Sequence, residues 1–138
     1  MQITHQADYA IRTMVYLASQ DPNQRIATSQ IAKDYKIPPS FLTKIVSQLA
    51  IAGLLRTSRG ARGGVSLARP PEEISILDVL EAIDGPVLMN ECVSDSCVCP
   101  FKATCKIHRF WCETKDQLVA RLGGETLAQL AAKEEVPA

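Results

Sequence analysis

The sequence predicts a mainly helical fold that contains one small β-hairpin and one cysteine-rich loop. Apolar residues recur every three or four positions over most of the chain, which is the spacing of amphipathic helices. Residues 54–68 break this pattern, because short alternating segments flank a tip rich in glycine and arginine, as in a hairpin. All five cysteines lie between Cys92 and Cys112. Because the chain has 138 residues, these elements are expected to form one structural domain.

The first three helices are predicted from their apolar stripes and from the residues that end them. A helix over residues 6–19 places six residues inward at helical spacing: Ala7, Ala10, Ile11, Met14, Val15 and Ala18. A second helix begins at Thr28 or Ser29, either of which can act as its N-cap. A proline-containing break precedes a third helix over residues 40–52, whose inner stripe consists of Phe41, Leu42, Ile45, Val46 and Leu49. Two short helices joined by a tight turn form a helix-turn-helix.

The hairpin that follows is the wing of a winged helix-turn-helix over residues 1–70. The second region of the domain, residues 71–138, begins with a short helix over residues 75–83 and continues with the cysteine loop. From Ile107 onward a long helix is predicted, and a last short helix covers residues 125–132. The apolar stripe of the long helix, which suits either a dimer interface or the chain's own core, consists of Ile107, Trp111, Leu118 and Leu122.

The charges of the two regions differ in sign, although the net charge of the chain is zero. Residues 1–69 carry nine Lys/Arg against three Asp/Glu, whereas residues 70–138 carry six against twelve. A basic half suits a polyanion, and an acidic half repels one. Chance variation of surface charge is the alternative explanation.

Polar and cationic residues on the third helix and the wing are the candidate contacts to double-stranded DNA. Short polar side chains near the start of a helix can reach base edges in the major groove, and arginine on a wing suits a narrow minor groove. The alternative for each is a solvated surface. The candidate DNA-binding residues are Thr28, Ser40, Thr43, Lys44, Ser47, Arg56, Arg59, Arg62 and Gly63.

The cysteines indicate a metal or redox site. No basic stretch followed by an apolar run opens the sequence, so a reducing, cytoplasmic location is expected, where disulfides are disfavoured. The spacing from Cys92 through Cys97 or Cys99 to Cys105 is looser than the paired cysteines of zinc ribbons, and favours an iron–sulfur cluster over structural zinc or incidental thiols. Cys112 lies within the long helix and is expected to be a small core residue.

Several segments of the chain resemble the Rrf2 (Rrf-two) family of bacterial transcriptional regulators. The similarity covers nearly the whole chain and is carried by MQITHQADYA (residues 1–10), RGARGGVSL (59–67), LDVLEAIDGP (77–86), the cysteine loop and TLAQL (126–130). The resemblance implies a homodimer formed through the long helix, with two recognition helices about 34 Å apart on a palindromic operator.

The resemblance also implies a ligand set for an iron–sulfur cluster, either 2Fe-2S or 4Fe-4S. Cys92, Cys99 and Cys105 match the three cluster cysteines of the family. His108 stands where IscR-type members place a histidine ligand, and Asp8 where NsrR-type members supply a carboxylate across the dimer; an ion pair with Arg12 is the simpler role for Asp8. Cys97 departs from the family pattern and could replace Cys99 as a ligand.

Together these features predict a DNA-binding regulator, with repression as the expected mode, whose DNA affinity depends on a cluster that senses nitric oxide, redox or iron–sulfur status. The alternative is a cluster-free or zinc-bound winged-helix regulator with thiol-based redox sensing. An enzyme is not expected, because no C-x-x-C pair, phosphate-binding loop or Ser/His/Asp set is recognisable. Neither a membrane association nor an organic small-molecule substrate is expected.

Overall fold

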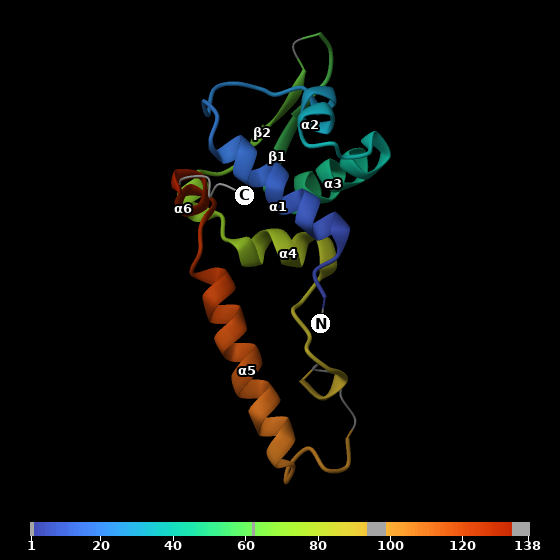
Figure 1. Ribbon diagram of the computed structural model, residues 1–138, viewed down its shortest axis with the longest axis vertical. Coiled ribbons are helices and arrows are strands. Elements are labelled where there is room, and N and C mark those ends of the chain that lie inside the picture. The colour runs from blue at the N-terminus through green and yellow to red at the C-terminus, as the bar shows by residue number, and fades with distance from the viewer. Residues whose placement is uncertain (1, 62, 94–98, 134–138) are drawn as a thin grey trace.

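A computed structural model describes residues 2–61, 63–93 and 99–133 of the chain (Figure 1). The α-helices in these ranges are α1 (His5–Ala18), α2 (Thr28–Asp34), α3 (Pro39–Ile51), α4 (Ile76–Asp84), α5 (Lys106–Gly123) and α6 (Leu127–Ala132). The strands β1 (Leu55–Ser58) and β2 (Gly64–Leu67) form an antiparallel hairpin, and two 3-10 helices follow, η1 (Pro71–Glu73) and η2 (Glu91–Val93). The predicted winged helix-turn-helix is therefore confirmed.

The core lies where α1 packs against α3, α4 and α6. The Thr4 side chain caps α1 by accepting a hydrogen bond from the Ala7 amide at 3.1 Å. Ala7 and Met14 on α1, Ile45 on α3 and Val79 on α4 have no measurable exposure. Helix α3 thus rests on the same apolar core as the elements that follow the hairpin.

The hairpin is attached to the body of the molecule by a bridge to the segment before α2. The Ile26 amide donates to the Val65 carbonyl at 3.0 Å, and the Val65 amide donates to the Ile26 carbonyl at 2.8 Å. Gly64 has a φ of 151°, and a Cβ at this position would lie 2.5 Å from the Ile26 carbonyl oxygen. Glycine is required here because the two backbones approach so closely.

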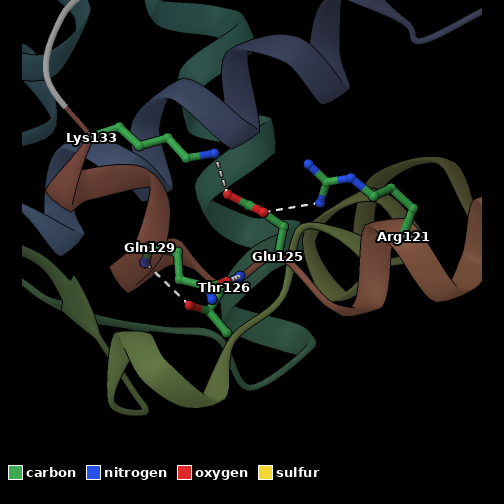
Figure 2. A network of polar contacts seen from close by, with 5 residues as sticks. All are labelled: Arg121, Glu125, Thr126, Gln129 and Lys133. Atoms are coloured by element: carbon green, nitrogen blue, oxygen red, sulfur yellow. Dashed lines mark hydrogen bonds and ion pairs between the residues drawn. The ribbon is translucent and has the colours of Figure 1, made fainter.

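Helix α5 stands away from this body as an arm (Figure 1). The chain leaves α4 and runs outward past η2, and α5 then leads back to the body. At the body end of the arm, Glu125 accepts bonds from Arg121 of α5 at 2.9 Å and from Lys133 at 2.6 Å (Figure 2). Thr126 caps α6 through a capping box with Gln129. The junction between α5 and α6 is therefore held by side chains on both sides.

Three expectations about individual residues are wrong. Phe41 is 45% exposed instead of lying on the inner stripe of α3, because it falls at the boundary of the buried face and packs edge-on against Tyr9. Ala27, and not Thr28 or Ser29, is the N-cap of α2, with no side-chain cap bond. Cys112 is half-buried and outside the core, because it lies on the part of α5 that stands away from the body. Among the described residues, no helix combines the length and apolar character needed to cross a bilayer.

Candidate DNA-binding surface and metal-binding loop

The outward face of α3 is polar from Ser40 to Ser47, and the exposed Ile51 follows on the same face. Helical geometry places Ser40, Thr43, Lys44 and Ser47 on one side, and all four are exposed. The opposite side buries Leu42, Ile45, Val46 and Leu49. The Thr43 hydroxyl donates to the Pro39 carbonyl at 2.9 Å, so its oxygen still has a lone pair to accept a further bond.

The hairpin after α3 carries exposed arginines. Arg56 on β1 and Arg59 at the tip are exposed, and Arg62 lies outside the described residues. Gly63 is half-buried, and its amide donates to the Gly60 carbonyl at 2.9 Å. A Cβ on Gly63 would lie 2.8 Å from the Arg59 carbonyl carbon, so this glycine shapes the turn that carries the arginines.

The start of α2, helix α3 and the hairpin come together around one shallow depression. Thr28 is exposed at the edge of this depression, whose lining also includes Ser29, Val46, Thr57, Ser58 and Gly63. No acidic residue occurs in the sequence between Asp34 and Glu72. Of the DNA-binding candidates, the depression brings together Thr28 and Gly63, and no carboxylate from residues 35–71 lies near it to oppose a phosphate backbone.

The described loop cysteines are free, half-buried thiols spread along the loop. The Cys92 thiol donates to the Asn90 side-chain oxygen at 2.7 Å. Cys105 is the N-cap of α5, and its sulfur accepts a hydrogen bond from the His108 amide at 3.4 Å. Cys97, the possible substitute ligand, lies outside the described residues.

Each candidate fourth ligand has a neighbour other than the loop cysteines. The Asp8 carboxylate pairs with Arg12 at 3.0 Å, as its simpler role predicted. His108 Nε2 lies 3.4 Å from Cys112 Sγ. Within the described ranges, no three His, Cys, Asp or Glu side chains are grouped closely enough to hold a metal ion. Thiol and imidazole donors nevertheless fit iron–sulfur or zinc chemistry by type.

Sequence reasoning missed the contact between His108 and Cys112. Residues four positions apart lie on the same face of a helix, so the spacing alone could have indicated it. Cys112 was instead expected to be a small core residue because it lies within a helix.

The free end of α5 exposes large apolar side chains. Ile107 is 65% exposed, Phe110 59%, and Phe101 just before the helix 68%. The chain exposes 9344 Å² in total, whereas a compact protein of 15.1 kDa exposes about 7,100 Å². The arm thus leaves apolar surface that a compact monomer would bury.

Comparison with known proteins assigns the chain to a family. A family model described as "Rrf2", an iron-dependent transcriptional regulator, matches residues 3–133. The chain belongs to the Rrf2 family. This family consists of transcriptional regulators and not of enzymes.

Relatives of this Rrf2-family chain include regulators of several bacteria. It is 33% identical over 108 residues to the HTH-type transcriptional regulator NsrR of Shouchella clausii, covering 78% of this chain and 72% of that protein. It is 45% identical over 87 residues to a Mycobacterium tuberculosis protein named as an HTH-type transcriptional regulator, covering 63% of this chain. That match spans only 54% of the mycobacterial protein's length.

Solved structures share the fold of this Rrf2-family chain. CymR of Bacillus subtilis, titled the global cysteine regulator, superposes with a TM-score of 0.80 at 27% identity, over 98% of this chain and 99% of that one. The IscR structure from T. potens gives a TM-score of 0.76 at 21% identity, over 99% of this chain and 94% of the other, a likeness of fold.

Proposed function

We propose that this Rrf2-family chain is a cytoplasmic transcriptional regulator that binds double-stranded DNA, with repression as its mode. The observation that supports the proposal is that α3, with its exposed polar residues, contacts β1 of the hairpin, which carries exposed arginines. In this arrangement α3 enters the major groove, where Ser40, Thr43, Lys44 and Ser47 reach base edges and phosphates. Arg56 and Arg59 add backbone or minor-groove contacts.

The regulator acts as a homodimer formed through α5. The exposed apolar residues Ile107 and Phe110 at the free end of α5 support this. A two-fold dimer places the two α3 helices on the two half-sites of a palindromic operator.

The cysteine loop holds an iron–sulfur cluster that controls DNA affinity. Cys92, Cys99 and Cys105 are the thiolate donors, with Asp8 or His108 as the remaining ligand. A bound cluster supplies redox- and nitric-oxide-sensitive metal–thiolate bonds. Through these cysteines it joins the loop to the start of α5, and hence to the dimer arm. Switching the operator from mostly bound to mostly free requires about 5 kcal/mol of differential affinity.

The DNA-binding part of the proposal is tested by selecting binding sites from a random duplex library with the full-length protein. We expect enrichment of a palindrome with half-sites one helical turn apart. Titration of the selected duplex, against a scrambled duplex of equal composition, then gives the specificity ratio. Failure to enrich any sequence, with both duplexes bound equally, contradicts a sequence-specific regulator.

The cofactor part is tested on protein purified without oxygen. We expect a coloured preparation that contains iron and acid-labile sulfide, and whose operator affinity falls after nitric oxide or chelation. The Asp8→Ala and His108→Ala variants identify the fourth ligand, because the variant that lacks this ligand is the one expected to lose the cluster. A colourless preparation that contains zinc, and whose DNA affinity responds to thiol oxidants, favours the thiol-sensing alternative.

A further inference from the structure

We propose that His108 and Cys112 bind the same metal atom, so that α5 supplies a two-donor chelate in which Cys112 takes the place of one loop cysteine and the centre keeps four protein donors. Cys112 is then a ligand, a role that the resemblance to the family does not imply. This inference rests on the metal-binding part of the proposed function and names a further residue of that site.

The separation of the two donor atoms suits one tetrahedral metal. A thiolate at about 2.3 Å and an imidazole nitrogen at about 2.0–2.1 Å from such a metal lie about 3.5–3.6 Å apart. Cys112 Sγ and His108 Nε2 lie 3.4 Å apart before any metal is bound. Two donors four residues apart on a helix also occur in the H-E-x-x-H zinc motif, where both bind one ion.

The pair faces the cysteine loop. Helical geometry places His108, Cys112 and Lys115 on the same side of α5. The Lys115 ammonium donates to the Val93 carbonyl in η2 at 3.4 Å, so this side of α5 is the one that η2 covers. Cys92 belongs to η2. His108 and Cys112 are both half-buried, whereas Arg109 and Glu113 beside them in the sequence are exposed.

A second loop cysteine is connected to the pair through the start of α5. The Cys105 sulfur accepts a bond from the His108 amide, which fixes the first turn of the helix against that sulfur. His108 therefore lies between two cysteines, bonded through its backbone to one and adjacent through its ring to the other. Thiolate and imidazole donors select zinc, iron or cobalt over magnesium or calcium.

Cobalt(II) is the probe, because thiolate-to-cobalt charge-transfer absorption reports the bound sulfurs. The metal-free, reduced full-length protein is titrated with Co²⁺ without oxygen, together with Cys112→Ala, Cys112→Ser and His108→Ala. The matched control is His5→Ala, the only other histidine of the chain, exposed at the start of α1. Far-ultraviolet circular dichroism establishes that each variant is folded.

We expect Cys112→Ala, Cys112→Ser and His108→Ala each to weaken Co²⁺ binding by more than about 100-fold, the upper end of the cost of removing an outer-shell partner, while His5→Ala binds like the wild type. Both Cys112 variants also lose part of the charge-transfer intensity. Unchanged affinity and intensity in the two Cys112 variants would overturn the proposal.

Anaerobic reconstitution with iron and sulfide separates this inference from the proposed function. If the wild type forms a cluster and both Cys112 variants form it with the same iron content and the same electron paramagnetic resonance spectrum, the inference fails and the proposed cluster stands. If no protein forms a cluster but Co²⁺ binding depends on His108 and Cys112, the inference stands and the cluster fails.

Discussion

The main chains of Ser75 and Thr126 pair in an antiparallel bridge that ties the junction between α5 and α6 to the start of α4. On either side of it, the Ile76 amide donates to the Glu125 carbonyl at 3.0 Å and the Leu127 amide donates to the Ile74 carbonyl at 2.9 Å. Leu127 has no measurable exposure. The arm therefore joins the body at a fixed point. In the proposed homodimer this is required if contacts between the two arms are to set the spacing of the two α3 helices.

Glu125 makes the stability of this junction depend on pH. Hydrogen bonds from Lys133 and then Arg121 hold the pKa of the Glu125 carboxyl below its ordinary value (Figure 2). A lowered pKa in the folded state stabilises the fold above the ordinary pKa, and this contribution is lost as pH falls through the folded value. We expect Glu125→Gln to lower the free energy of unfolding at neutral pH, with a difference from wild type that shrinks as pH falls from about 6 to about 3.

Urea unfolding at several pH values measures this difference. Glu113→Gln is the matched control, because Glu113 also pairs with an arginine four residues away, Arg109, but both side chains are at least 60% exposed. Exposed pairs contribute little to stability. A Glu125→Gln effect that is equally large at low and neutral pH contradicts the electrostatic explanation.

The turn between α2 and α3 carries a local strain that a single substitution removes. Lys36 has a φ of 53°, in the left-handed region, and is not a glycine. That conformation costs a residue with a side chain about 1–2 kcal/mol. Glycine avoids this cost, but it loses more conformational entropy on folding, which offsets the gain by about 0.5–1 kcal/mol. We expect Lys36→Gly to raise the free energy of unfolding by about 0.5–1 kcal/mol, measured by urea denaturation.

Lys33→Gly is the comparison, since Lys33 is also exposed but lies within α2. Glycine there costs about 1 kcal/mol of helix stability. If both variants destabilise the protein, the left-handed conformation of Lys36 is not a source of strain.

The fold could be predicted in outline because its signals are local. Apolar spacing placed α1, α3 and α4 to within one or two residues of their observed bounds. Phe41 was misplaced because a stripe of apolar residues does not state where the buried face ends. That boundary depends on α1, whose Tyr9 packs against the Phe41 ring.

The site could be predicted as a set of residues but not as a geometry. The exposed positions of α3 follow from helical period once Leu42 and Leu49 are known to be buried. The cysteine loop has no periodic pattern. The sequence therefore identifies the cysteines that can donate to a metal but does not predict how they are arranged in space. The four-residue spacing of His108 and Cys112 indicates that they share a helix face, but that this face stands away from the core is a property of the whole fold that no local pattern contains.

Arg59 provides a direct test of the wing. Each phosphate contact contributes about 0.9 to the slope of log affinity against log salt concentration, and a dimer contains two copies of the wing. We expect Arg59→Ala to weaken binding to specific and scrambled duplexes alike, and to reduce the salt slope by about 2 per dimer. Fluorescence anisotropy titrations over a range of salt give both quantities. Arg109→Ala, which removes an exposed arginine on α5, is expected to leave the slope unchanged.

Phe110 tests the dimer arm. Its ring is 59% exposed and packs edge-on against Trp111, with 5.4 Å between the ring centres. A carboxylate at a buried aromatic anchor costs more than the loss of the anchor, about 2 kcal/mol or more, because the charge is desolvated without a partner. We expect Phe110→Asp to raise the dimer dissociation constant by about 30-fold or more, measured by analytical ultracentrifugation. Ile51→Asp is the control, since Ile51 is 85% exposed on α3, away from the arm. Equal dissociation constants for the two variants would place the dimer interface elsewhere than α5.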